Sequence, residues 1–237
     1  MLISVVLVYG HYKMVQTINP YNPFVYIVES PRDDDLLYER TEGKALTEAL
    51  KLCGIISTYS LTCSKRMFKE ALTSRLKKDC HDKKRFPIIH FSVHGCEQGI
   101  GLTNEELVSW NELRQLLIPL NREMQGGLLV CFSSCFGAYS CLMEFNNQIE
   151  SSFGTTVGHN EKVSWSNSAV AYISFYNRLF QGASIKDCVE AMRKATGDDN
   201  FEYFESQIVK QAYLADVSNR IRNQNLNSHM TFLGDIF

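Results

Sequence analysis

The sequence predicts a three-layer α/β/α fold in which helices cover both faces of a mainly parallel central sheet. Three observations support this fold class: apolar runs recur along the chain, each run is continuous rather than alternating, and segments with helical spacing separate the runs. Continuous apolar runs are typical of strands buried on both faces, and regular strand–helix alternation is typical of parallel sheets. Crossover connections between such strands are right-handed.

The first half of the chain sets up this alternation. Residues 1–22 form an N-terminal extension of uncertain structure, with a candidate strand at 2–8. Strands are predicted at 24–30, 55–61 and 86–95, and helices at 40–53 and after Ser64, a candidate N-cap. The acidic run at 33–35 and the basic run at 83–85 read as solvated loops, and 77–85 as a polar turn.

The second half continues the pattern after a glycine-rich loop at 95–101. Ser109 and Glu112 have the spacing of a capping box, and a helix with a leucine face follows them. Further strands are predicted at 128–132 and about 153–158, further helices at about 137–148, 166–181 and 185–195, and a last short strand at 229–235. The whole chain, 1–237, is predicted to be a single domain.

Composition limits the function classes. Hydrophobic residues make up 45% and charged residues 21%, and the formal net charge is −2. No charge field of one sign favours nucleic-acid binding or attachment to a membrane surface. The eight cysteines lie mainly in apolar segments, and the apolar start of the chain is too short to span a bilayer and lacks a cleavage site. We therefore expect free thiols in a reducing, cytoplasmic setting.

Two reactive side chains follow consecutive predicted strands. His94 comes at the end of the strand from Phe86, and Cys135 follows the strand from Leu128. Sites in parallel sheets form beyond the carboxyl ends of the strands, and strands joined by one crossover are often neighbours. Each residue alone is more often a packing or capping residue. Together, in this order, they favour a catalytic pair.

The chemistry of the pair is that of a thiol nucleophile. A neighbouring imidazole lowers the pKa of a thiol and can later protonate a leaving amine. The oxyanion that forms needs donors, and the backbone N–H groups of Gly95 and Cys135 are the candidates.

These motifs resemble the caspase-fold cysteine peptidases of clan CD. "FSVHG" and "CFSSCFG" match the strand ending in His-Gly and the Cys-x-Gly of caspases, with two serines in place of Gln-Ala before the cysteine. The similarity is greater to the bacterial CHAT branch, whose members follow His-Gly with a polar hairpin and a Trp-x-Glu-Leu helix, here "WNEL". "FYNRLFQGASIKDCVEAMRKA" and the terminal "FLGD" extend the resemblance over residues 24–235.

The resemblance implies a His94/Cys135 dyad that cleaves a protein or peptide substrate, with no metal and no organic cofactor. Caspases that cut after Asp hold that carboxylate with an Arg beside a Ser-Trp pair, whereas "SWSN" at 164–167 has no Arg. Specificity for Asp is therefore not expected. Trp165, Ser166 and Asn167 are candidates for the substrate groove.

Relatives of the CHAT type usually fuse this domain to a sensor. This chain holds little besides the predicted peptidase domain, so we expect a separate regulatory protein to switch it, within a bacterial defence or cell-death pathway. A catalytically silent module that binds a partner protein is the alternative.

Two further readings stay open on the residues alone. His90, His94 and Cys96, with Cys80 and His81, have spacing compatible with zinc, although a histidine inside an apolar strand is more often a hydrogen-bonded core residue. His159 follows another predicted strand without an assigned role.

Overall fold

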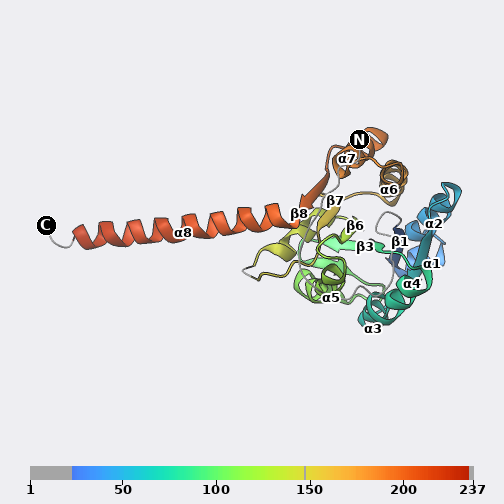
Figure 1. The fold of residues 1–237 in the computed structure, drawn as a ribbon, viewed down its shortest axis with the longest axis horizontal. Coiled ribbons are helices and arrows are strands. Elements are labelled where there is room, and N and C mark those ends of the chain that lie inside the picture. The colour runs from blue at the N-terminus through green and yellow to red at the C-terminus, as the bar shows by residue number, and fades with distance from the viewer. Residues whose placement is uncertain (1–22, 147, 235–237) are drawn as a thin grey trace, which may run out of the picture.

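The computed structural model describes residues 23–146 and 148–234, and its central sheet confirms the predicted fold class (Figure 1). The strand order is β2-β1-β3-β6-β7-β8. Along this order neighbours are parallel from β2 to β7, and the edge strand β8 is antiparallel to β7. The strands are β1 (Phe24–Ser30), β2 (Ser57–Leu61), β3 (Pro87–Cys96), β4 (Gly99–Gly101), β5 (Leu107–Ser109), β6 (Leu129–Ser133), β7 (Thr155–His159) and β8 (Phe201–Glu205).

Helices cover both faces of the sheet, and each face has its own apolar core. The helical segments are α1 (Asp33–Leu37), α2 (Glu42–Leu52), α3 (Lys65–Glu70), the π-helical η1 (Ala71–Arg75), α4 (Leu76–Lys83), α5 (Trp110–Glu123), the 3₁₀ helix η2 (Gly137–Glu144), α6 (Trp165–Phe180), α7 (Ile185–Thr196) and α8 (Ser206–Gly234). Phe68, Leu72 and Leu113 place α3–α4 and α5 on one face. Leu46, Phe175 and Val189 place α2, α6 and α7 on the other. The three-layer arrangement follows because alternate side chains of each buried strand feed the two cores.

Most predicted strands and helices agree with the structure within a few residues, because their local signals are strong. The predicted capping box at Ser109 and Glu112 is confirmed, with both reciprocal hydrogen bonds present. Ser64 accepts a hydrogen bond from the Met67 N–H as the predicted N-cap of α3. In the short hairpin that follows β3, β4 lies within the predicted glycine-rich loop at 95–101 and pairs with the end of β3, whereas β5 lies beyond that loop. The candidate strand at 2–8 lies outside the described residues.

Four predictions are wrong. The run 33–35 is not a solvated loop but begins the short helix α1, and Asp35 is buried. Residues 77–85 are mostly helix α4, because Leu76 and Cys80 pack on the core and extend the helix beyond Arg75. The helix expected at 137–148 is a 3₁₀ helix that ends at Glu144. The strand expected at 229–235 is wrong because β8 already occupies the sheet edge, and the chain then enters α8, which runs to Gly234.

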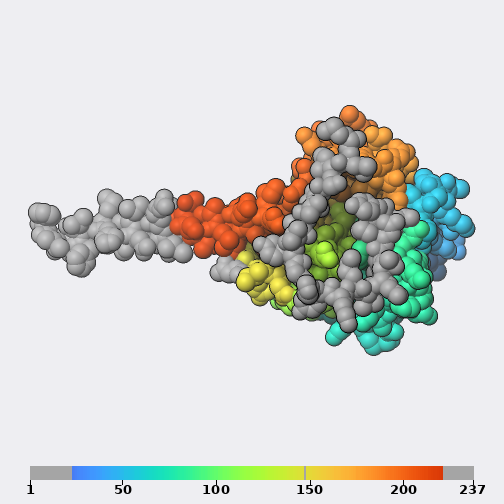
Figure 2. All heavy atoms as spheres, viewed as in Figure 1, coloured from blue at the N-terminus to red at the C-terminus, as the bar shows by residue number. Residues whose placement is uncertain are grey.

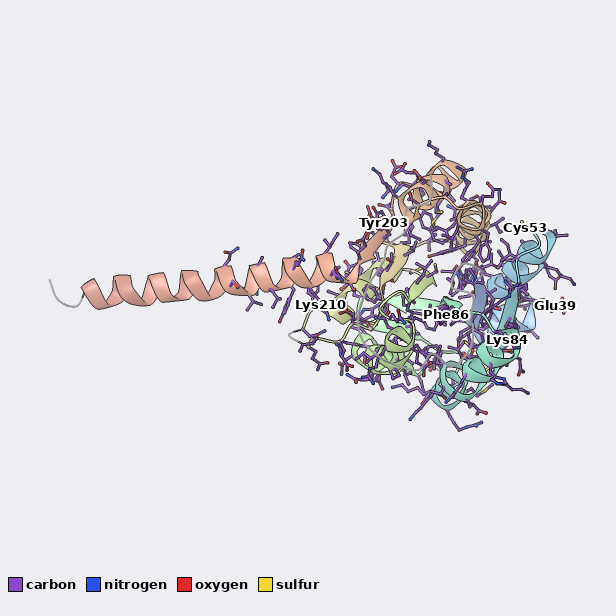
Figure 3. The ribbon with its side chains drawn as sticks, viewed as in Figure 1. Glu39, Cys53, Lys84, Phe86, Tyr203 and Lys210 are labelled. Atoms are coloured by element: carbon purple, nitrogen blue, oxygen red, sulfur yellow. The ribbon has the colours of Figure 1, made fainter. Side chains whose placement is uncertain are left out.

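Helix α8 projects away from the body of the molecule (Figures 1 and 2). Near its start, Lys210 lies within 3.1 Å of the buried Glu144 carboxylate at the end of η2 and donates hydrogen bonds to the carbonyls of Gln148 and Ile149 (Figure 3). A buried carboxylate is costly unless it is paired, so this contact fixes the base of α8 to the body. None of the described helices has the length and apolar character needed to cross a membrane.

Candidate active site

The two predicted reactive residues lie at the carboxyl ends of two neighbouring central strands. Strands β3 and β6 are parallel neighbours, and Ser92 is in register with Ser133. His94 and Cys135 each come two residues later, just beyond the paired part of their strands. Both line a cavity of about 290 Å³. The other residues of its lining are Arg32, Val93, Ser134, Val163, Ser164 and Trp165.

Cys135 is partly exposed and is held in a tight loop between β6 and η2. Its Sγ lies 3.7 Å from the Val163 carbonyl oxygen. The next residue, Phe136, has a φ of 55°, in the left-handed region that non-glycine residues rarely adopt. The Phe136 N–H donates a hydrogen bond to the Glu161 carbonyl at 2.9 Å. Surrounding structure must hold this backbone, because its conformation is unfavourable in isolation.

His94 lies between a carboxylate and an aromatic ring. Its Nε2 is 3.7 Å from Asp35 Oδ2, an ionic contact that is too long for a hydrogen bond. The edge of its ring meets Trp165, with centroids 5.2 Å apart. Burial lowers the pKa of His94 below its ordinary value, the Arg32 charge lowers it further, and the Asp35 carboxylate opposes both. The neutral imidazole, which can accept a proton, is therefore favoured.

Gly95 allows the two loops of the site to approach each other. A Cβ at this position would lie 2.0 Å from the Cys135 carbonyl oxygen, so a larger residue would displace the cysteine loop. The peptide of Gly95 also has a defined direction. Next to β4, the Leu102 N–H donates to the Glu106 carbonyl, and the Gln98 carbonyl accepts from the Trp110 N–H. The even-numbered residues of β4 therefore direct their peptide groups to β5.

Alternate residues of an antiparallel strand direct their peptide groups to opposite sides. Gly99 and Gly101 therefore direct theirs to β3, where they oppose Cys96 and His94. On β3, Gly95 lies between those two residues and turns its N–H away from β4. The Cys135 carbonyl lies close to the Cα of Gly95.

The candidate groove residues separate into two groups. Trp165 lines the cavity, and neither Ser166 nor Asn167 belongs to the lining. Ser166 instead contacts Ser164 through their hydroxyl groups at 3.0 Å, and the Ser164 hydroxyl accepts from the Asn167 N–H at the start of α6. The two residues thus belong to the helix cap, and Trp165 alone of the three faces His94.

Four of the other cysteines are buried enough that they are not expected to react in place of Cys135. Burial raises the pKa of Cys131 to about 12 and that of Cys80, Cys141 and Cys188 to about 11. A thiol is nucleophilic only as the thiolate, so these four are expected to be unreactive near neutral pH. Cys53 is exposed, and all eight cysteines are free.

The residues of the zinc reading do not converge. His90 is fully buried, with its Nδ1 3.0 Å from the Tyr176 hydroxyl, on the face covered by α6. Cys80 packs against the opposite core, and the His81 side chain is 88% exposed on α4. Among the residues that the structure describes, no three His, Cys, Asp or Glu side chains form a group suited to a metal ion.

Two neighbours of His94 were not anticipated from the sequence. Asp35 and Arg32 lie just after β1, which pairs with β3, so the topology brings them to the end of β3. The signal that could have found them is the position of the acidic run, directly after a buried strand at the same sheet edge.

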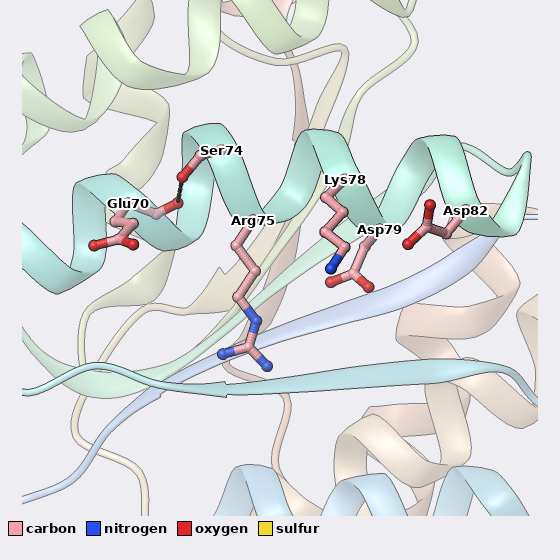
Figure 4. A pocket seen from close by; sticks show the side chains of 6 residues that line it. All are labelled: Glu70, Ser74, Arg75, Lys78, Asp79 and Asp82. Carbon is pink, nitrogen blue, oxygen red and sulfur yellow. Dashed lines mark hydrogen bonds between the residues drawn. The ribbon is translucent and has the colours of Figure 1, made fainter.

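A larger cavity, of about 520 Å³, lies elsewhere on the surface. All six residues of its lining come from the continuous helical segment formed by α3, η1 and α4, as Figure 4 shows. It contains acidic and basic side chains and one hydroxyl, but no thiol or imidazole, and Lys83 lies 2.9 Å from one of its carboxylates, Asp79. It lacks the groups needed for nucleophilic catalysis and is not the candidate site.

The architecture is the caspase-like α/β fold, which the chain shares with solved cysteine proteases. Iotapain, a secreted C11 cysteine protease from Bacteroides thetaiotaomicron, superimposes with a TM-score of 0.57 at 10% identity, over 87% of this chain and 72% of iotapain. The Arg-specific cysteine proteinase gingipain R superimposes with a TM-score of 0.52 at 9% identity, over 80% of this chain and 48% of gingipain R. No protein-family model and no curated protein matches the sequence. These likenesses establish the fold, and the CHAT branch stays a prediction.

Proposed function

We propose that the chain is a cysteine endopeptidase in which Cys135 is the nucleophile and His94 the general acid and base. The observation that carries this proposal is that an imidazole and a partly exposed thiol line one cavity at the carboxyl ends of neighbouring parallel strands. The lowered pKa of His94 keeps its imidazole available as a proton acceptor. Cys135 attacks the peptide carbonyl, His94 protonates the leaving amine, and water then hydrolyses the thioester.

The oxyanion is stabilised by the backbone N–H groups of Gly95 and Cys135. The direction of the Gly95 peptide, away from β4, supports its assignment. Because a Cβ at Gly95 would collide with the Cys135 carbonyl, the two N–H groups belong to segments that lie very close together. Fixed donors at this position contribute without reorganising during the reaction.

Asp35 acts on the reaction through His94 and is a positioning residue. Its carboxylate lies on the Nε2 side of the imidazole, so the opposite nitrogen is left for the thiol and the substrate. A carboxylate in this position stabilises the imidazolium that forms when Cys135 loses its proton. Arg40 holds the same carboxylate through its Nε at 2.9 Å.

The substrate is a protein or peptide, in line with the two solved proteases that share the fold. Val163, Ser164 and Trp165 line the cavity. In this proposal an extended substrate chain passes over Trp165. No metal or organic cofactor takes part in the proposed reaction. The eight free thiols are consistent with a reducing, cytoplasmic setting.

A separate regulatory protein is proposed to activate the enzyme, and the bacterial defence or cell-death role rests on the resemblance to CHAT proteins. A partner that shortened the 3.7 Å distance between His94 and Asp35 would strengthen the base. Turnover of about 1 s⁻¹ or faster by the purified chain alone, which is ordinary for enzymes, would contradict this part of the proposal.

The deciding experiment is selective labelling of Cys135 with a peptide that carries a thiol-reactive group. Cys53→Ser, which removes an exposed thiol outside the site, is the control and is expected to label as the parent does. Cys135→Ala should abolish both labelling and peptide cleavage. Even labelling of several cysteines would instead favour the catalytically silent binding module.

A further inference from the structure

We infer that a second histidine–aspartate pair, His159 with Asp198, positions the loop that carries the nucleophile. The inference rests on the proposed role of Cys135 and adds a residue that no part of the proposed reaction uses. His159 does not line the cavity, and so it acts through the backbone of its neighbours rather than on the substrate.

His159 ends β7 with a side chain that is 1% exposed. Its Nε2 lies 3.0 Å from Asp198 Oδ2, and its Nδ1 lies 3.0 Å from both the nitrogen and the carbonyl oxygen of Glu161. The ring packs edge-on against Phe201 at a centroid distance of 4.8 Å. Because the Asp198 carboxylate can only accept, Nε2 carries the ring proton and donates it, and an Nδ1 without a proton accepts from the Glu161 N–H, so both ring nitrogens have partners.

The Glu161 peptide connects this pair to the nucleophile loop. Its N–H donates to His159, and its carbonyl accepts from the Phe136 N–H at 2.9 Å. Phe136 directly follows Cys135 and has the unfavourable φ of 55°. The same turn continues to Val163, whose carbonyl lies 3.7 Å from the Cys135 sulfur. Two contacts from one turn thus hold the backbone and the thiol of the site.

The other end of the pair is also anchored. Asp198 Oδ1 accepts from the Asn200 N–H, and the Asn160 N–H donates to the Asn200 carbonyl at 3.0 Å. The hydrogen bonds from His159 and Asn200 lower the pKa of Asp198 although burial raises it. The aspartate therefore stays ionised and fixed, and it keeps the His159 ring oriented with Nδ1 towards Glu161.

The backbone packs closely where the end of β7 meets the start of η2. A Cβ on Gly158 would lie 2.3 Å from the Gly137 carbonyl carbon and 2.5 Å from the Ala138 nitrogen. The end of β7 therefore lies directly against the start of η2. Neither backbone has space to shift at this contact, so the loop that carries Cys135 has little freedom to move away from the Glu161 turn.

Two substitutions of His159 separate its two hydrogen bonds. Asparagine places an amide oxygen near the Nδ1 position and can accept from Glu161, whereas glutamine places its amide nitrogen near Nε2 and can donate to Asp198. The measurement is the rate of Cys135 alkylation by iodoacetamide, followed by mass spectrometry of the proteolytic peptide that contains Cys135, together with kcat and KM for a cleaved peptide. His81→Gln, at an exposed position, is the control.

We expect His159→Gln to slow Cys135 alkylation and to lower kcat about tenfold with KM unchanged, since a misplaced nucleophile affects the chemical step. His159→Asn should stay within about threefold of the parent, because it keeps the hydrogen bond to the turn. If both variants behave alike at equal folded fraction, or if only the melting temperature changes, the inference is wrong.

Should both His159 variants fail to fold, Asp198→Ala decides the matter from the more exposed end of the pair. It should give an intermediate loss of alkylation rate, and an unchanged rate would overturn the inference. Alkylation also separates this inference from the proposed function. A parent chain that is alkylated at Cys135 but cleaves no peptide would refute a peptidase that is active as the isolated chain, and the order of the alkylation rates among the variants would still test the role of His159.

Discussion

Among the residues that the structure describes, two histidine–aspartate pairs lie near the carboxyl ends of the parallel strands, and the two pairs differ in the distance between their side chains. In the His159–Asp198 pair the side chains are 3.0 Å apart, and the histidine is 1% exposed. In the His94–Asp35 pair they are 3.7 Å apart, and the histidine side chain is 27% exposed. Both ring nitrogens of His159 have hydrogen-bond partners, whereas the Nε2 of His94 has none among the described residues.

The difference fits two tasks. A residue that only orients its neighbours gains from short, buried hydrogen bonds, which rigidify the structure around it. A residue that exchanges protons must be able to change its charge and its partners during the reaction. The looser pair is therefore expected to respond to substitution mainly in chemistry, and the tighter pair in the position of the nucleophile loop.

The largest effect is expected from His94→Ala. Removing the acid and base should lower kcat/KM for a peptide substrate by about 10³-fold or more, since residual catalysis would come only from binding and the oxyanion donors. Stability should change little because the side chain is partly exposed. The control is His81→Ala on α4. Activity within tenfold of the parent would show that His94 is not the acid and base.

Gly95→Ala should follow in size and tests the close approach of the two loops. Its Cβ would lie 2.0 Å from the Cys135 carbonyl oxygen, so the donors for the oxyanion must move apart, and kcat should fall by about 10²-fold. Gly101→Ala is a matched control in the facing strand, because its Cβ would approach the His94 Cβ at an ordinary 3.7 Å. Comparable losses in both variants would contradict this explanation.

Asp35→Asn is expected to have a smaller effect, which measures how much the loose pair contributes. Without the carboxylate the imidazolium is less stable, so the pKa of His94 should fall further below its ordinary value, and kcat should fall about tenfold. Asp34→Asn, one residue away and exposed, is the control. A loss as large as that of His94→Ala would mean that Asp35 is needed for the structure of the site rather than for its electrostatics.

The sequence predicts those residues of the two pairs that a local strand pattern places, and it does not predict those that only the pairing of distant strands brings together. His94 and Cys135 stand at the ends of strong apolar runs, so strand order alone predicts their meeting. Asp35 is hidden in a run of three aspartates that looks solvated, and only the pairing of β1 with β3 places it beside His94. His159 is visible at a strand end, but its partner Asp198 follows α7 and comes near only through the antiparallel strand β8.

The same reasoning explains the errors in the fold. β8 has only five residues, with charged residues between its aromatic ones, and an antiparallel edge strand breaks the strand–helix rhythm that guided the prediction. The last strand was expected from the terminal "FLGD", a loose motif. Helix α8 lacks a pronounced apolar face, and so its length could not be recognised from periodicity.

Arg32→Ala tests the role of His94 through the pH dependence of kcat/KM rather than through the size of the rate. The Arg32 charge lowers the pKa of His94, so its removal should raise that pKa, whereas Asp35→Asn should lower it. Because neutral His94 is the base, the acid limb of kcat/KM should move to higher pH in Arg32→Ala and to lower pH in Asp35→Asn. Arg66→Ala, a surface control on α3, should leave the profile unchanged. Limbs that move in the same direction would show that His94 does not set the profile.

The smallest effect on activity is expected from Tyr172→Phe, which tests the rigid support beneath the tight pair. The Tyr172 hydroxyl on α6 donates to the Phe132 carbonyl of β6 at 2.9 Å and lies 3.2 Å from the Val157 carbonyl of β7. Its loss leaves buried carbonyls with one partner fewer and should lower the free energy of unfolding by about 1–3 kcal/mol. The glycine contacts and the Glu161 turn remain, so kcat should stay within about twofold of the parent.

Tyr38→Phe, at an exposed position, is the control for denaturant unfolding. A large loss of kcat in Tyr172→Phe with unchanged stability would place the support of the nucleophile in α6 rather than in the turn held by His159.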